Sequence, residues 1–280
     1  MLGKRRLAQL RCHAMDRYPQ RIVCLTEETT ETLYWLGAQD RIVGVSGFTQ
    51  RPAHARREKP IVSAFTSADL PKITALKPDL VLAFSDLQAD IVRDLIKSGF
   101  NVFTFNQRSV QEILSVIAQL GALVGKAEAA ALLIAQLSQN LERAAESARR
   151  LPVRPRVYFE EWPDPLISGI RWVSELIEIA GGHDVFAELR SQPAATGRIV
   201  QASDIAARDP ELILASWCGK MVKPERIRAR PELATTAAIR CDRIVEIKST
   251  LILQPGPAAL SDGLAALVAA ISDCAHSIAR

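Results

Sequence analysis

The feature that most constrains the fold of this chain is the alternation of short apolar runs with longer segments of helical period. In the first half, runs rich in Val, Ile and Leu predict strands over residues 22–25, 42–45, 80–83 and 102–105. Helices are predicted between them over residues 30–36, 70–75 and 89–98, each followed closely by a glycine or a proline. Uninterrupted apolar runs are typical of parallel strands that helices cover on both faces. The predicted class is therefore α/β, with parallel sheets.

The second half of the chain repeats this pattern. Strands are predicted over residues 156–159, 212–215 and 244–247, and a helix over residues 173–180. The clearest internal match aligns residues 73–85 with residues 205–217, with six identities in thirteen positions. Convergence of two unrelated α/β units is the alternative to duplication. Because similar elements precede and follow each copy, the repeat favours two Rossmann-like lobes of similar build.

Two helices are predicted between the halves, over residues 109–123 and 126–150. The second contains no Gly or Pro, and its 25 residues would span about 38 Å at 1.5 Å per residue. The predicted organisation is an N-terminal tail (1–20), an N-terminal α/β lobe (21–123), an inter-lobe helix (124–150) and a C-terminal α/β lobe (151–280). Two lobes joined by one long backbone helix predict a ligand cleft between them.

Aromatic residues are concentrated where the predicted strands end. Only 5% of the chain is aromatic, yet five of its twelve Phe and Trp residues follow predicted strands: Phe48, Phe65, Phe84, Trp162 and Trp217. Ligands of open parallel sheets bind outside the carboxyl ends of the strands, and large flat ligands pack against exposed rings. The alternative is that each ring caps the core of its own lobe. Taken together, the five rings favour a large flat ligand.

Carboxylates also follow the predicted strands and raise the alternative of catalysis. Glu27, Glu28, Glu160 and Glu161 could form an acid–base pair. No nucleophile elbow, zinc-protease, Walker A or dinucleotide-binding motif accompanies them. Glu27 and Glu28 also stand where a helix begins, and a helix N-terminus stabilises negative charge. We therefore predict a binding protein with no catalytic residue, and keep an enzyme that uses these carboxylates as an alternative.

Metal capture, nucleic-acid binding and membrane insertion find little support in the composition. The four histidines are scattered, which predicts no protein-bound metal but leaves open a ligand that carries its own metal. A net charge of +4 is spread along the chain, so no nucleic-acid partner is expected. The start lacks an apolar stretch of about 7–15 residues, and no run is long enough to span a membrane. The sequence as it stands predicts a cytoplasmic protein, or a periplasmic one if the true start lies upstream.

The sequence resembles the substrate-binding proteins of ABC importers that carry cobalamin, ferric siderophores or haem, and most closely the cobalamin-binding branch. The resemblance covers residues 21–271. It is carried by RIVCLTEETTE (21–31), LG (36–37), IVGVS (42–46), ITALKPDLVL (73–82), SGIRW (168–172) and EIAGG (178–182). It implies two lobes with a helical backbone, and aromatic rings on the ligand loops. Phe48, Phe65 and Phe84 match such positions, and Trp162 falls in the corresponding loop of the second lobe.

The resemblance also implies a membrane permease as partner, docked through an acidic residue on each lobe. Pro71 and Ser203 stand at those places here, with Asp69 and Asp204 close by, which departs from the docking pattern that the resemblance implies.

The predicted function is non-enzymatic binding of a corrinoid, either in vitamin uptake or in a cytosolic derivative of that role. Cobalamin or a related corrinoid would be its ligand and not a prosthetic group. The predicted contacts are Glu27, Glu28, Phe48, Phe65, Thr66, Phe84, Asp86, Asn106, Gln107, Glu161, Trp162, Arg171, Trp217 and Gln254. The main alternative is a ferric siderophore or haem, for which Arg108, Arg171 and Lys220 could supply positive charge.

Overall fold

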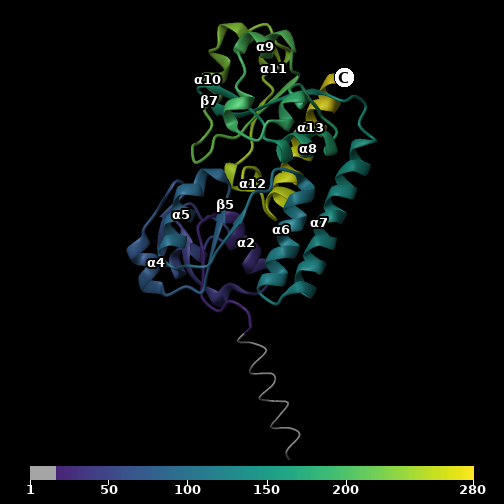
Figure 1. Ribbon diagram of the computed structural model, residues 1–280. Helices are drawn as coiled ribbons and strands as arrows, with labels where there is room; N and C mark the ends of the chain where they lie inside the picture. The colour runs from purple at the N-terminus through teal and green to yellow at the C-terminus, as the bar shows by residue number, and fades with distance from the viewer. Residues whose placement is uncertain (1–16) are drawn as a thin grey trace, which may run out of the picture. The chain divides into compact units, whose positions relative to one another are not determined.

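The computed structural model describes residues 17–280, and residues 1–16 of the predicted tail lie outside this range. The chain forms two compact units. The first comprises the residues up to Gln107 together with Leu114–Ile134, and the second comprises Arg108–Ile113 with Ala135–Arg280. Each unit contains its own sheet with helices packed around it (Figure 1), so the predicted α/β class with parallel-rich sheets is confirmed.

The first unit is built on a sheet with strand order β4-β3-β2-β1-β5-β6. All pairs are parallel except β3 with β4, which form an antiparallel hairpin at one edge. The strands are β1 (Ile22–Cys24), β2 (Ile42–Ser46), β3 (Ile61–Ala64), β4 (Ser67–Ala68), β5 (Leu80–Phe84) and β6 (Val102–Phe105). The helices are α2 (Glu27–Trp35), α3 (Ala55–Glu58), α4 (Leu70–Leu76) and α5 (Ala89–Lys97). Fully buried Val23, Val81 and Leu95 belong to its core.

The second unit is built on a sheet with strand order β11-β10-β7-β8, in which β9 also pairs with β7. Only the β7–β8 pair is antiparallel. The strands are β7 (Arg156–Pro163), β8 (Leu166–Ser168), β9 (His183–Asp184), β10 (Leu212–Ala215) and β11 (Ile244–Glu246). The helices are α8 (Arg171–Ile179), α9 (Ala202–Ala207), α10 (Pro224–Arg228), α11 (Ala237–Arg240), α12 (Ser249–Ile252) and α13 (Leu264–Ile278).

Helices α6 (Val110–Leu123) and α7 (Ala127–Ala148) each contribute residues to both units. They correspond to the two helices predicted between the halves of the chain. Close packing between them requires Gly121, because a Cβ there would lie 2.4 Å from Cβ of Ala130. Helix α7 is continuous over 22 residues, slightly shorter than the predicted helix.

The internal repeat has a physical basis in the way each unit holds its central strand. Helices α4 and α9 both end before a residue in the left-handed conformation, Lys77 (φ 47°) and Asp209 (φ 40°), followed by a proline and an acid. The acid of the first copy, Asp79, accepts the backbone N–H of Arg21 at 2.9 Å. The acid of the second copy, Glu211, accepts the backbone N–H of Arg156 at 2.9 Å. The repeated motif therefore fastens the start of the neighbouring strand in both units.

Arg21 and Arg156 complete these two fastenings in the same way. The Arg21 Nε donates to the carbonyl of Leu76 at 3.0 Å, and the Arg156 Nε donates to the carbonyl of Asp209 at 2.8 Å. Each arginine thereby pairs with a carbonyl at or just past the end of a helix, Leu76 of α4 or Asp209 after α9. The last carbonyls of a helix have no partner within the helix itself.

Three features depart from the predicted elements. Strand β7 continues to Pro163, four residues past its predicted end, because it pairs there with β8. Helix α2 begins at Glu27, three residues before its predicted start. The β3–β4 hairpin was not among the predicted strands, because one fully buried apolar residue, Val62, is too weak a strand signal. Glu160, Glu161 and Trp162, which were predicted to follow a strand, therefore lie within β7.

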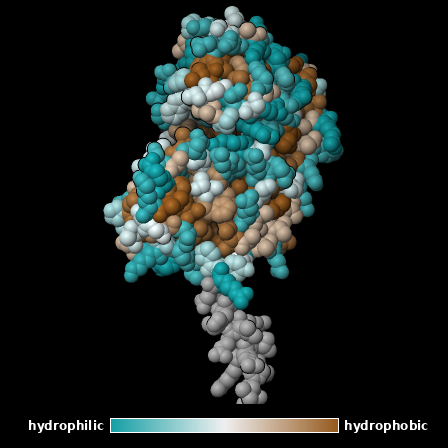
Figure 2. All heavy atoms as spheres, viewed as in Figure 1, coloured by the Kyte–Doolittle hydropathy of each residue, from teal (hydrophilic) through white to brown (hydrophobic). Residues whose placement is uncertain are grey.

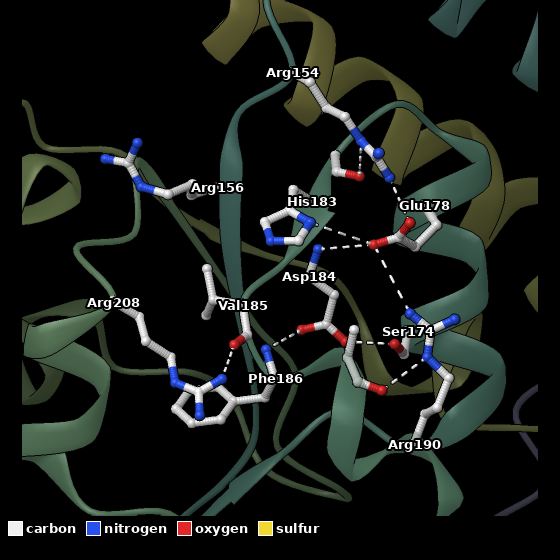
Figure 3. Close-up of polar contacts among 12 residues, drawn as sticks. Arg154, Arg156, Ser174, Glu178, His183, Asp184, Val185, Phe186, Arg190 and Arg208 are labelled. Carbon is white, nitrogen blue, oxygen red and sulfur yellow. Dashed lines mark hydrogen bonds and ion pairs between the residues drawn. The ribbon is translucent and has the colours of Figure 1, made fainter.

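A polar cluster joins β9 to helix α8 near the amino end of β7 (Figure 3). The Glu178 carboxylate pairs with the guanidinium groups of Arg154 and Arg190 and lies 3.8 Å from Nδ1 of His183. The buried carboxyl of Asp184 accepts hydrogen bonds from the Ser174 hydroxyl and, at 3.0 Å, from the Phe186 N–H. Burial raises the pKa of Asp184. The cluster lies at the amino end of β7, away from the carboxyl edge where ligands of such sheets bind.

Candidate functional site

The carboxyl ends of the parallel strands in the first unit gather most of the predicted contacts. Glu27 and Glu28 follow β1, Phe48 follows β2, Phe65 and Thr66 form the β3–β4 turn, Asp86 follows β5, and Asn106 and Gln107 follow β6. Because β1, β2, β3, β5 and β6 all run in parallel, these residues share one edge of the sheet. Thr66, Asp86 and Asn106 are exposed there, and Gln107 is buried.

Two buried carboxyl groups begin helix α2 at this edge. Glu27 is 3% exposed and accepts the N–H of Gln50 at 2.9 Å. Glu28 is 2% exposed and accepts the hydroxyl of Thr26 at 2.5 Å. Burial raises the pKa of Glu27 to about 8 and the pKa of Glu28 to about 7. Around neutral pH these groups therefore carry protons for part of the time, and a protonated carboxyl both donates and accepts hydrogen bonds.

A third buried acid on the same helix is already paired. Glu31 Oε1 accepts Nε of Arg51 at 2.8 Å, so the positive charge of Arg51, which also lowers the pKa of Glu27, is balanced by Glu31. The amino half of α2 is thus a buried polar segment, which is unusual for glutamates unless a partner or a function requires it.

The three predicted phenylalanines of the first unit have different environments. Phe48 is 49% exposed and lines a hollow of about 510 Å³ together with Ile61 and Lys72. Phe65 is half-buried. Phe84 is only 7% exposed and belongs to the packed end of β5, so its ring is a core cap in this structure. Phe48 and Phe65 are therefore the rings that this edge presents.

Gln88 holds the Phe65 turn in place, although it was not among the predicted contacts. Its buried side-chain amide donates to the carbonyl of Phe65 at 2.9 Å and accepts the N–H of Phe84 at 3.0 Å. The neighbouring Ser85 is buried with a φ of 64°, a conformation that is strained for a residue with a side chain. The only sequence signal for this role was the position of Gln88, four residues after the end of β5.

The second unit presents Trp162 on the β7–β8 hairpin. The half-buried indole donates its N–H to the carbonyl of Asp164 at 2.9 Å. The ammonium of the exposed Lys220 lies 4.2 Å from the ring centroid, in a cation–π contact.

Hydrophobic patches reach the surface of both units on the face drawn in Figure 2.

Glu161 is engaged by the protein itself. The Arg198 guanidinium, 1% exposed, donates to both of its carboxylate oxygens, at 2.7 and 3.0 Å. The N–H of Ile170 donates to the same carboxylate at 2.9 Å. The Glu161 carboxylate thus accepts three hydrogen bonds within the second unit and holds Ile170 and Arg198 in place, while its direct contact with a ligand stays a prediction.

Trp217 lies in the core and not on the surface. It is 2% exposed, packs with Tyr158 and Phe186, and donates its indole N–H to the Glu160 carboxylate at 3.1 Å. Arg230 forms a two-point ion pair with the same carboxylate. The prediction that the Trp217 ring faces a ligand is thus not reflected in this structure, since a fully buried acid occupies its only donor.

The remaining predicted contacts of the second unit are at the surface or close to it. Arg171 is exposed, and its Nε donates to Glu175 at 2.8 Å, so its charge is balanced locally. Gln254 is half-buried after α12. Arg108 is half-buried, and its backbone N–H donates to Glu112 at 2.6 Å. Arg108, Arg171 and Lys220 were the cations proposed to bind an anionic chelate. Of these, Lys220 has its charged group over an aromatic ring, that of Trp162.

Residues 17–280 contain no group of three or more His, Cys, Asp or Glu side chains placed to hold a metal ion. The same part of the chain contains no helix with the length and apolar character that a membrane span requires.

Two α/β units, each with aromatic and polar side chains at the carboxyl edge of a parallel sheet, define a two-lobed binding protein. The chain belongs to the Periplasmic binding protein family, whose model matches residues 22–251. Members of this family are binding proteins, and the predicted family is confirmed.

Similar proteins are found among curated sequences and solved structures. A "Cobalamin-binding protein" of Halobacterium salinarum is 27% identical over 256 residues, which cover 87% of this chain and 67% of that protein. A "Vitamin B12-binding protein" of Yersinia pestis is 25% identical over 249 residues, 81% of this chain and 87% of that protein. The periplasmic heme-binding protein RhuT from Roseiflexus sp. RS-1 matches with a TM-score of 0.79 and 22% identity, over 91% of this chain and 99% of that one. This last match shows the shared fold.

Proposed function

We propose that this protein binds a corrinoid, using the exposed rings at the carboxyl edges of its sheets, and that it serves as the substrate-binding protein of an ABC importer or as a derivative of one. The observation that carries the proposal is the set of accessible rings Phe48, Phe65 and Trp162 beside hydrogen-bonding side chains. Flat faces and a few placed polar groups are what a large ring ligand requires. The curated relatives named for cobalamin and vitamin B12 support the same ligand class.

The charge at the first unit's edge favours a corrinoid over haem or a ferric chelate. Glu27, Glu28 and Glu31 are acids, and the nearby Arg51 is already paired with Glu31. Haem carries two propionates and many ferric chelates are anionic, so the fraction of Glu27 and Glu28 that is ionised near neutral pH would repel them, and the protonated fraction would give them no cation to pair with. The rim of a corrinoid carries neutral amides, which donate to carboxylates and accept from protonated carboxyls. An amide-rimmed ring therefore suits these acids better than an anionic one.

The test is a titration of purified protein with cyanocobalamin, followed by Trp fluorescence, corrin absorption and calorimetry. We expect one ligand per chain, with Kd in the micromolar range or tighter. Phe65→Ala and Trp162→Ala should each weaken binding by about tenfold or more, because stacked rings contribute on the order of 1–2 kcal/mol each. Binding should be unchanged by prior treatment of the protein with a chelator, because the cobalt is expected to gain no protein ligand.

Trp35→Ala is the matched control, because Trp35 is also a large ring, 45% exposed, at the far end of α2 from the acids. It should leave the affinity within about twofold. Absence of binding at about 100 µM cyanocobalamin, or equal losses for Trp35→Ala and Trp162→Ala, would contradict the proposal. Haem and ferric chelates would then be titrated in the same assay.

A permease partner is part of the proposal, and the structure shows what the two nearby acids do. Asp69 caps α4 by accepting the N–H of Lys72 at 3.0 Å, and Asp204 forms a capping box with Gln201 at the start of α9. The carboxylates of Asp69 and Asp204 thus each cap a helix in their own unit. A permease that docked on these charges would contact carboxylates that are already hydrogen-bonded to the helix.

A further inference from the structure

We propose that Lys220 recognises a negative group of the ligand at the face of Trp162, and that for a corrinoid this group is the phosphodiester of the nucleotide tail. The inference rests on the proposed function and adds a residue that selects among corrinoids. It starts from an exposed cation that lies over an indole ring held by its hairpin.

The Trp162 ring is rigid because its hairpin is fixed from several sides. Its N–H is bound to the Asp164 carbonyl at 2.9 Å, and Trp162 pairs with Ile167 across the hairpin. One residue earlier, Glu161 is held by both guanidinium nitrogens of the buried Arg198. Arg198 also donates to the carbonyl of Ser168, at the end of β8. The hairpin therefore keeps the indole in one place before any ligand arrives.

The backbone that carries Lys220 is also fixed. Its N–H donates to the Trp217 carbonyl at 3.0 Å, and Trp217 is buried in the core with its indole bound to Glu160. Further along the same loop, the N–H of Val222 donates to the Glu246 carboxylate at 3.3 Å. Only the long side chain of Lys220 is left to move.

The charge of Lys220 is not neutralised within the part of the chain that the structure describes. No Asp or Glu of residues 17–280 forms an ion pair with its ammonium, which instead lies 4.2 Å from the centroid of the Trp162 indole ring. Arg171 and Arg198, by contrast, each contact a carboxylate at 2.8 Å or less. Lys220 is thus an exposed cation with its charge available to a ligand.

The chemistry of a corrinoid supplies one matching group. The amides on its rim are neutral, whereas the phosphodiester that joins the nucleotide tail carries a full negative charge. A flat part of the ligand that stacks on Trp162 would displace the ammonium from the ring, and the flexible side chain could then pair with the phosphodiester. Such a charge-assisted hydrogen bond is stronger than the exposed cation–π contact that it replaces.

The test compares two corrinoids with and without the anion. Cyanocobalamin contains the phosphodiester and the nucleotide, whereas dicyanocobinamide lacks both. Lys220→Met should weaken cyanocobalamin binding by about tenfold, the usual scale for losing one charge-assisted contact, and change dicyanocobinamide binding by less than about twofold. Lys220→Arg should keep most of the affinity. In wild-type protein, raising NaCl from 50 to 500 mM should weaken cyanocobalamin binding more than it does in Lys220→Met.

Lys223→Met is the matched control, because Lys223 is exposed on the same loop but has no ring beneath it. Lys223→Met removes the same charge a few residues away, where the charge is exposed and lies over no ring. It should therefore leave the affinities for both corrinoids within about twofold of wild type. Equal losses for both corrinoids in Lys220→Met would show that Lys220 only supports the ring, and would overturn the inference. No loss for either would overturn it too.

The two proposals can fail separately. If wild-type protein binds cyanocobalamin and Lys220→Met binds it equally well, corrinoid binding stands and the role of Lys220 falls. If wild-type protein binds neither corrinoid at about 100 µM, the proposed function fails and this inference fails with it. A haem titration is the third arm: haem binding that depends on Lys220 would assign the cation to propionates and would likewise refute the phosphodiester as its partner.

Discussion

Two glutamates at the start of α2 show how burial changes the chemistry of single residues. Glu27 and Glu28 are almost fully enclosed, and burial is the largest cause of their raised pKa values. The Gln50 N–H and the Thr26 hydroxyl lower these values, and neighbouring Glu31 raises them. Arg51 offsets part of the repulsion at Glu27. The net result is a pair of carboxyl groups that titrate near neutral pH.

Their raised pKa values predict a stability that falls as the pH rises. An unfolded glutamate has a pKa near 4.5, whereas Glu27 has a pKa of about 8 when folded, so the folded protein binds the proton more tightly between these values. The stabilisation is fully present below about pH 4.5 and is lost as the pH rises through about 8. Glu27→Gln has no such proton to lose. We expect its Tm to exceed that of the wild type by about 3 °C or more at pH 8.5.

The comparison requires thermal unfolding of both proteins at several pH values from 5 to 8.5. The gap should shrink as the pH falls, because the wild-type carboxyl becomes protonated and resembles the amide. Glu142→Gln, at an exposed position of α7, is the control and should show no pH-dependent gap. A gap of the same size at pH 5 and 8.5 would rule out titration of Glu27 as the cause.

At the residue scale, the sequence placed aromatic rings at the carboxyl ends of strands but could not distinguish the exposed rings from the buried ones. Phe48 and Trp217 both follow a strand, yet one is 49% exposed and the other 2%. The difference arises from Glu160, which lies 57 residues from Trp217 in the chain and accepts its indole N–H. No local pattern contains that partner. The same applies to Glu161, whose partner Arg198 lies 37 residues away.

The β7–β8 hairpin shows how an element can depend on one buried ion pair. Arg198 contacts Glu161 and the Ser168 carbonyl, and so joins the two strands of the hairpin. Removing the cation leaves a largely buried carboxylate without its partner, which costs far more than losing an exposed pair. The hairpin should therefore be sensitive to change at Arg198, whose own side chain is only 1% exposed.

We expect Arg198→Met to lower the free energy of unfolding by about 3 kcal/mol, the lower end for a buried pair because Glu161 is 18% exposed. Urea unfolding measures the change. Arg149→Met is the control, since Arg149 and Glu146 form an exposed pair at the carboxyl end of α7 that is worth about 1 kcal/mol or less. The double change Arg198→Met with Glu161→Leu should recover part of the loss. Equal effects of the two arginine changes would show that the buried pair is not what stabilises the hairpin.

Elements with strong local patterns were predicted well, and elements that depend on distant pairing were not. Strands β6 and β10 match their predicted limits, because apolar residues fill them and turn-forming residues bound them. The β7 extension contains Glu160 and Glu161, which no pattern would place in a strand. It forms because β8 supplies hydrogen-bond partners and two arginines neutralise the acids.

At the scale of the whole molecule, the internal repeat and the shared helices bear on how the chain unfolds. Asp79 and Glu211 perform the same task in separate units, each accepting a backbone N–H at the start of a central strand. Helix α7 runs without interruption through residues of both units. Melting one unit alone would break this helix partway, with the loss of backbone hydrogen bonds at the break. We therefore expect one cooperative unfolding transition.

Asp79→Ala and Glu211→Ala test this expectation together. Each removes an acceptor for backbone N–H groups, and each should lower the free energy of unfolding by about 1–2 kcal/mol. Because the two acids lie in different units and share no partner, their effects on a single transition should add to within about 0.5 kcal/mol. Urea unfolding followed by far-UV circular dichroism and by Trp fluorescence would measure the single and double variants. If the two signals separate, and Asp79→Ala shifts one transition while Glu211→Ala shifts the other, the units unfold independently and the continuous helix does not couple them.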